Sequence, residues 1–120
     1  MAKKEKKTDS YAVGKGTKDV KVSIDVGLGQ LGSVKLSVDK SPIASVPAPL
    51  GLQNLGPGSA LKGKLLIAEV LVTDVSIMTN KMSVVLKLTG GAASKTITTN
   101  GEVVDQGDSI LFQIFVLIKE

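Results

Sequence analysis

The sequence contains no cysteine, histidine, arginine or tryptophan, and its aromatic residues are one tyrosine and two phenylalanines. Without cysteine the chain can form no disulfide and offers no thiolate nucleophile. Without histidine it lacks the commonest metal ligand and the usual acid/base group of catalytic triads. We therefore expect a protein that is not an enzyme and that binds no cofactor.

The scarcity of aromatic side chains also disfavours sugar binding and single-stranded nucleic-acid binding, since both usually depend on aromatic platforms. What the chain has in quantity is aliphatic: 42% of its 120 residues are hydrophobic, and Val, Leu, Ile and Ala supply most of them. A chain of this length is typical of one domain. We expect one aliphatic core, with recognition through backbone edges, loops and apolar patches.

The positive charge is concentrated at the N-terminus. The formal net charge is +4, and residues 1–18 account for it with six lysines against Glu5 and Asp9. Residues 1–17 show no hydrophobic periodicity, so we predict a flexible lysine-rich arm there. A polyanion-binding role for this arm would use Lys3, Lys4, Lys6 and Lys7. The absence of arginine makes specific nucleic-acid recognition unlikely, because lysine lacks the bidentate fork.

No apolar run reaches the roughly 18 to 20 residues that a membrane-spanning helix needs. The basic start is not followed by the apolar segment of a secretory signal, which favours a cytoplasmic location.

Alternation of apolar and polar residues predicts strands over 20–26 and 33–39. Between them, "GLGQLG" (27–32) has the Gly-x-Gly-x-x-Gly spelling of dinucleotide-binding loops. That motif needs a helix directly after the glycines, whereas an alternating segment follows here. We interpret the glycines as a hairpin loop instead.

Residues 40–60 contain all four prolines and predict a long irregular connection that covers the sheet or binds a partner, with room for short edge strands. Residues 61–76 predict a long strand, bent at Gly63, although helical spacing also fits part of the segment. Residues 82–90 alternate again and predict a second hairpin. Asn100-Gly101 is the favoured pair of a type I′ turn and predicts a further hairpin.

The C-terminal run "SILFQIFVLIKE" (109–120) is apolar on both faces of a strand. One face carries Ile110, Phe112, Ile114, Val116 and Ile118, and the other carries Leu111, Gln113, Phe115, Leu117 and Lys119. Antiparallel sheets usually bury one face and leave the other to solvent. The second face therefore needs a cover, either the 40–60 segment or another subunit.

Three carboxylates, Glu102, Asp105 and Asp108, lie close together in the sequence and are weak candidates for a calcium loop. Their spacing matches no EF-hand, so solvated turn residues are the simpler interpretation.

About seven short strands separated by turns predict an all-β fold, an immunoglobulin-like antiparallel β-sandwich over residues 18–120, with a small β-barrel as the alternative. We expect a non-catalytic structural or protein-interaction module that self-associates, as a homo-oligomer, through Leu111, Gln113, Phe115 and Leu117. A polyanion-binding protein and a calcium-binding sandwich are the alternatives.

Overall fold

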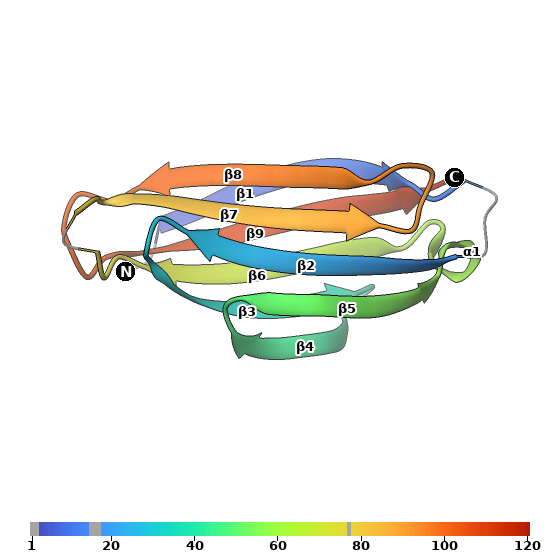
Figure 1. Cartoon of the computed structure of the whole chain (residues 1–120), viewed down its shortest axis with the longest axis horizontal. Coiled ribbons are helices and arrows are strands. Elements are labelled where there is room, and N and C mark those ends of the chain that lie inside the picture. The colour runs from blue at the N-terminus through green and yellow to red at the C-terminus, as the bar shows by residue number, and fades with distance from the viewer. Residues whose placement is uncertain (1–2, 15–17, 77) are drawn as a thin grey trace.

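Two stacked β-sheets make up the protein in a computed structural model that describes residues 3–14, 18–76 and 78–120 (Figure 1). The molecule is elongated, with principal extents of 47 × 22 × 21 Å. Both sheets are open at their edges, so the fold is an all-β sandwich rather than a closed barrel.

The larger sheet has five strands, and its C-terminal strand lies next to its N-terminal one. In spatial order the strands are β1 (Lys3–Ala12), β9 (Ser109–Lys119), β6 (Leu65–Thr73), β3 (Leu31–Val38) and β4 (Ser41–Pro47). Strand β1 pairs with β9 in parallel, and the other neighbours are antiparallel.

The smaller sheet has four antiparallel strands. They are β5 (Leu50–Pro57), β2 (Asp19–Gly27), β7 (Lys81–Thr89) and β8 (Lys95–Glu102), in that order. The single-turn helix α1 (Gly58–Leu61) follows β5. The described part of the chain thus has nine strands, more than the seven expected. None of its helices is long or apolar enough to cross a membrane.

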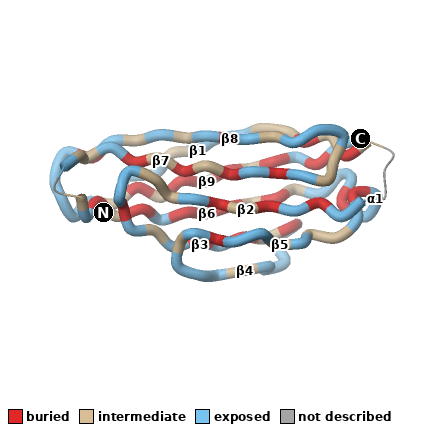
Figure 2. The backbone as a smooth tube through the Cα atoms, in the orientation of Figure 1, coloured by how far each residue is buried: buried red, intermediate tan, exposed pale blue. Residues whose placement is uncertain are grey.

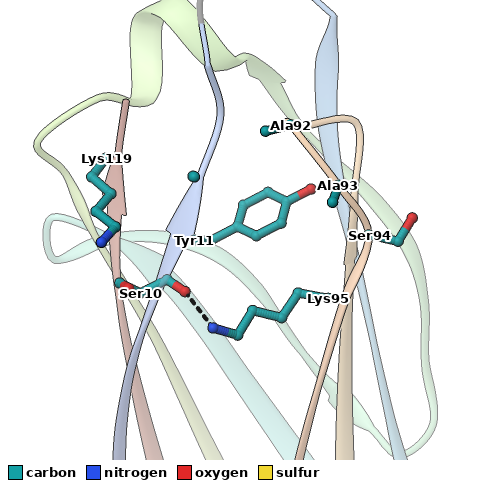
Figure 3. A pocket seen from close by; sticks show the side chains of 8 residues that line it. Ser10, Tyr11, Ala92, Ala93, Ser94, Lys95 and Lys119 are labelled. Atoms are coloured by element: carbon teal, nitrogen blue, oxygen red, sulfur yellow. Dashed lines mark hydrogen bonds between the residues drawn. The ribbon is translucent and has the colours of Figure 1, made fainter.

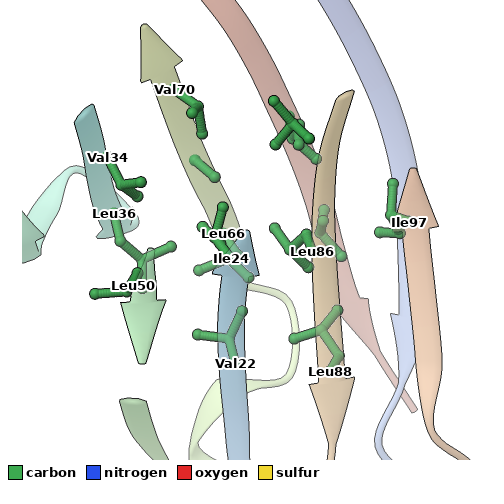
Figure 4. Close-up of a cluster of buried hydrophobic side chains, with 14 of the residues drawn as sticks. Val22, Ile24, Val34, Leu36, Leu50, Leu66, Val70, Leu86, Leu88 and Ile97 are labelled. Atoms are coloured by element: carbon green, nitrogen blue, oxygen red, sulfur yellow. The ribbon is translucent and has the colours of Figure 1, made fainter. Parts of the chain in front are cut away.

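The core lies between the sheets and is aliphatic, as expected. The alternating inward positions of β2, β3, β6, β7 and β9 are almost completely buried (Figure 2). Side chains such as Ile24, Leu66 and Leu86 interdigitate from the two layers (Figure 4). Full burial of one such side chain stabilises the fold by about 1.5–3 kcal/mol. Most residues of the core lie at these alternating positions.

The "GLGQLG" segment is not a hairpin loop, because β2 and β3 belong to different sheets. The chain turns at Leu28 and Gly29, whose φ angles are 62° and 74°, and crosses from one layer to the other. Gly32 serves a different purpose: a Cβ there would lie 2.8 Å from Cγ2 of Val26. The prediction failed because periodicity shows which face of a strand is buried but not which strand is its partner.

The second predicted hairpin is wrong for the same reason, since β6 and β7 also lie in different sheets. Among the described residues, two hairpins connect strands that are consecutive in the sequence and paired in one sheet. One joins β3 to β4 through Asp39 and Lys40, whose φ angles of 48° and 70° suit a two-residue turn. The other joins β7 to β8 through residues 90–94.

Asn100-Gly101 is likewise not a turn, because both residues lie inside β8 and pair with Ser83 and Met82 of β7. A Cβ on Gly101 would lie 2.7 Å from Cδ1 of Ile110, on the opposite sheet. Glycine is required here for the close approach of the two layers and not for turn geometry.

Residues 40–60 are more regular than predicted. They form β4 and β5, which are edge strands of different sheets, and the start of α1. The long strand predicted over 61–76 is shorter, since β6 begins at Leu65, after a turn in which Gly63 has a φ of +80°.

The N-terminus differs from the expected flexible arm over residues 3–12, which form β1. Tyr11 is only 2% exposed, and its hydroxyl accepts a hydrogen bond from the backbone N–H of Gly91 at 2.8 Å. Val13 is buried as well, and its N–H donates to the carbonyl of Lys119. The lysine-rich composition of this segment gave no indication that Tyr11 and Val13 are buried. Residues 1–2 and 15–17 lie outside the described part.

Candidate functional site

The second face of the C-terminal strand looks outward from the five-stranded sheet. Leu111, Gln113 and Phe115 are half-buried, and Leu117 is 48% exposed, while their inward neighbours are fully buried. The 40–60 segment does not cover this face. Its strand β4 lies beyond β6 and β3 at the far edge of the same sheet, and β5 belongs to the other sheet.

Strand β6 extends this apolar face, because its outward residues lie opposite those of β9. Of the five outward cross-strand pairs, three are wholly apolar: Leu65 with Leu117, Ile67 with Phe115, and Leu71 with Leu111. We call these six residues the outer stripe. Directly opposed apolar pairs support each other across a sheet, so the stripe consists of paired side chains on two neighbouring strands rather than of isolated ones.

A fourth pair interrupts the stripe with polar groups that contact each other, and the fifth, Thr73 with Ser109, ends it with a hydrogen bond of 2.9 Å between the two hydroxyls. Glu69 lies opposite Gln113, and the Gln113 amide nitrogen donates to a Glu69 carboxylate oxygen at 3.4 Å. Gln113, predicted as part of the interface, is therefore a polar centre of this face rather than an apolar contact.

Polar side chains flank the stripe on both sides. On one side of the stripe, strand β1 presents Lys4, Lys6 and Thr8 next to β9. On the other side, strand β3 presents Ser33, Lys35 and Ser37 next to β6. The Lys6 ammonium lies 5.4 Å from the centre of the Phe115 ring, within cation–π range. The face thus has two apolar segments, a polar pair between them and a basic rim.

The four lysines proposed for polyanion binding are divided between two sides of β1. Lys4 and Lys6 share the outer face with β9, whereas Lys3 and Lys7 are in register with inward positions of β9 at the lip of the sandwich. Lys3 forms an exposed ion pair with Glu5 at 3.1 Å. The strand therefore separates the four charges instead of gathering them on one surface.

The three candidate calcium ligands lie at one end of the sandwich. Glu102 ends β8, while Asp105 and Asp108 are exposed in the loop before β9, where the Asp105 N–H donates weakly to Asp108 Oδ2 at 3.4 Å. Among the residues that the structure describes, no three acidic side chains gather as a metal site would require. No observation on this loop favours calcium over solvated turn residues.

A buried polar node supports the same end of the molecule, and the sequence analysis missed it. Gln30 is 9% exposed, and its amide nitrogen donates to the carbonyls of Thr79 and Lys81. Its amide oxygen accepts from the N–H groups of Val75 and Ser76. One glutamine thereby ties the β2–β3 turn to the β6–β7 connection, which gives the node a structural role.

A shallow hollow of about 340 Å³ lies where the end of β1 meets the β7–β8 turn (Figure 3). Its lining includes Ser10, Tyr11, Lys95 and Lys119. The Lys95 ammonium is already engaged, with Asp9 at 2.7 Å and with the Ser10 carbonyl at 2.8 Å. The hydrogen bond from Lys95, helped by the Ser10 N–H, lowers the pKa of Asp9 below its usual value. These contacts hold the end of β1 against the β7–β8 turn. Because the Lys95 ammonium is engaged in them, it is not available to bind a ligand.

The residues of β6 are the part of the outer stripe that sequence reasoning missed. Leu65, Ile67 and Leu71 alternate with buried Leu66, Ala68 and Val70, so the segment is apolar on both faces, as β9 is. That shared property was the available signal, because a strand with two apolar faces differs from the usual antiparallel strand with one face in solvent.

No family model, no curated protein and no solved structure matches this chain in the comparisons with known proteins.

Proposed function

We propose that this chain is a non-catalytic protein-interaction module that self-associates through the outer stripe. The observation that carries the proposal is the uncovered pairing of β6 with β9, which presents six apolar side chains on the outside of the sandwich. Soluble monomers rarely expose large contiguous apolar patches, and such patches are typical of interaction sites. Leu71 and Leu117, 39% and 48% exposed, are its most accessible members.

A second copy of the chain is the occupant that the chemistry favours. The stripe is aliphatic apart from one phenylalanine, so it matches an apolar surface like its own. The polar pair that interrupts it, Glu69 and Gln113, shares one long hydrogen bond of 3.4 Å, and Lys35 of β3 lies opposite Glu69. Two such faces can stack like the layers of a sandwich, about 10 Å apart, around a two-fold axis. The lysines of the rim stay in solvent, where salt screens their repulsion.

The experiment replaces the two most exposed residues of the stripe together, as Leu71→Glu and Leu117→Glu. The solution mass, measured by size-exclusion chromatography with light scattering, should fall from that of an oligomer to that of a monomer. Unchanged circular dichroism would show that the variant is folded. Leu52→Glu is the matched control, because Leu52 is 61% exposed on β5 of the other sheet. If the control dissociates the oligomer equally, the stripe is not the interface.

We also propose that the sandwich is immunoglobulin-like in the order of its strands. The order β9-β6-β3-β4 supports it, since immunoglobulin domains place their last strand beside strand F, then C and C′. A departure accompanies this likeness. The β7–β8 hairpin lies between β6 and β9 in the sequence, where immunoglobulin domains connect strands F and G directly.

Polyanion binding through β1 is the second candidate, favoured by the exposure of Lys4 and Lys6 on the outer face and of Lys3 and Lys7 at the lip of the same edge strand. Phosphate contacts release counterions, so such binding should weaken steeply with salt. Titration of a labelled polyanion such as heparin against the chain and against Lys4→Ala/Lys7→Ala, at two salt concentrations, tests it. Equal affinity of the two proteins would exclude the lysines of β1.

A further inference from the structure

Three of the four sheet edges carry features that hinder pairing with another strand. Strand β1 is rich in lysine, β4 contains Pro42 and Pro47, and β5 pairs with β2 through two register shifts and ends at Pro57. Lysines, prolines and bulges are the usual means by which proteins block edge-to-edge association.

Strand β8 is the exception. All of its residues are described, and residues 96–101, "TITTNG", include neither charge nor proline. It pairs with β7 over eight consecutive positions without a register shift, so its backbone is regular. Threonine and isoleucine are also strand formers. The free edge of β8 is therefore competent to pair.

We propose that β8 pairs with β8 of a second copy, antiparallel, about a two-fold axis through Thr99. Such pairing would join the two smaller sheets into one continuous sheet. Residues opposite each other must then point to the same face. In β8 the odd-numbered residues Ile97, Thr99 and Gly101 face inward, in register with buried residues of β7, so odd must oppose odd. An axis through Thr99 satisfies this condition.

The side chains complement each other in this register. Inward-facing Ile97 would lie opposite Gly101 of the other copy, so two large side chains do not oppose each other at this pair. Outward-facing Thr98 would lie opposite Asn100, a pair able to hydrogen-bond. Thr96 would lie opposite Glu102. No like charges are opposed along β8, and Thr99 would lie opposite its own copy, a threonine pair of the kind that stabilises neighbouring strands.

Strand β1 supplies an independent reason for the same axis. It runs opposite to β8 along the same side of the sandwich, as Figure 1 shows: the Lys95 ammonium bonds to Asp9, and Lys3 lines a shallow hollow with Glu102. Counting inward from these two contacts places Lys6 across from Thr98 or Thr99. An axis through Thr99 therefore passes close to the middle of β1.

The charges on the lip of β1 are self-complementary about that point. Its residues in register with inward positions of β9 alternate in sign: Lys3, Glu5, Lys7 and Asp9. Reversal about Lys6 would bring Lys3 towards Asp9 and Glu5 towards Lys7 of the other copy, while the two copies of Lys6 meet on the outer face, where solvent screens them. The existing pairs, Lys3 with Glu5 and Lys95 with Asp9, would then become parts of a shared network. The edge is distinct from the outer stripe and does not depend on it.

Single cysteine substitutions test the register, because the chain has no cysteine of its own. Residues opposite each other in an antiparallel pair have Cα atoms about 4.5–5.5 Å apart, within disulfide range. Thr99→Cys should therefore form an intermolecular disulfide under mild oxidation. Thr96→Cys is the control, because in this register position 96 lies opposite position 102 of the other copy, six residues away from position 96 of that copy. We expect the disulfide of Thr99→Cys to form at least roughly tenfold faster, because pairing raises the effective concentration.

Equal rates for the two variants would mean random collision and would overturn the proposal. A charge exchange provides a second readout: Thr98→Lys with Asn100→Lys should abolish edge pairing, whereas Thr98→Lys with Asn100→Glu should restore it. Repeating the Thr99→Cys oxidation in the Leu71→Glu/Leu117→Glu background separates this edge from the outer stripe. There the disulfide should still form, even if the stripe interface is lost.

Discussion

The Cα of Gly101 on β8 approaches Ile110 on β9 so closely that a Cβ would lie 2.7 Å from the isoleucine Cδ1. The two residues belong to different sheets, so this contact sets the spacing between the layers at one end of the sandwich. Gly101→Ala should overpack the core and lower the free energy of unfolding by about 1–3 kcal/mol.

Urea unfolding followed by circular dichroism measures this cost. Gly51→Ala is the matched control, since a Cβ at Gly51 meets nothing within 4 Å. That substitution should be neutral or stabilise the fold by about 0.4–1 kcal/mol through the unfolded chain. Equal midpoints for the two variants would contradict the close contact at Gly101.

The β7–β8 turn depends on Gly90 for two reasons at once. Its φ is +92°, and a Cβ there would collide with the carbonyl oxygen of Asp19. Gly107 has a similar φ of +94° but nothing within 4 Å. Gly90→Ala should therefore lower the melting temperature clearly more than Gly107→Ala, which adds only backbone strain of about 1–2 kcal/mol. Equal losses by calorimetry would show that sterics at Gly90 are irrelevant.

Removal of the Gln30 side chain should be costly for its size. Gln30→Ala leaves two carbonyls and two N–H groups without their present partners, and we expect a loss of roughly 2–4 kcal/mol of unfolding free energy. Gln30→Glu keeps the acceptor but sets a second oxygen against the carbonyls of Thr79 and Lys81, so it should not rescue stability at neutral pH. A rescue by Glu, seen in urea unfolding, would contradict these contacts.

The Asp9–Lys95 pair predicts a pH dependence. The pKa of Asp9 is lowered from 3.8 by Lys95, so the folded protein binds this proton less readily than the unfolded chain does. The pair therefore stabilises the fold above pH 3.8, and the contribution is lost as the pH falls through the folded pKa. Asp9→Asn should flatten the stability curve in this acidic range. Identical acid-unfolding curves for both proteins would exclude the pair.

Local patterns in the sequence predicted the strands better than their partners. Alternation located the cores of β2, β3, β7 and β9, because burial of one face imposes a period of two. It could not assign strands to sheets, since inward faces look alike in both layers. This is why two connections between layers were taken for hairpins.

Non-local packing explains the remaining errors. The Asn100-Gly101 pair has strong turn propensity, yet Ile110 and Phe112 across the core make the glycine a packing residue. Strand β1 was not predicted because its sequence is rich in lysine. Its position in the sheet depends on Tyr11 and its contact with Gly91. The apolar second face of β9 was predicted, but its extension by Leu65, Ile67 and Leu71 required the pairing with β6.

The most direct test of the central claim is the solution mass of the unmodified chain by light scattering, over a range of concentrations at low and high salt. An aliphatic interface is insensitive to screening, so we predict an oligomer of the 12.4 kDa chain at both salt concentrations. A monomer at every concentration and both salts would contradict self-association through the outer stripe.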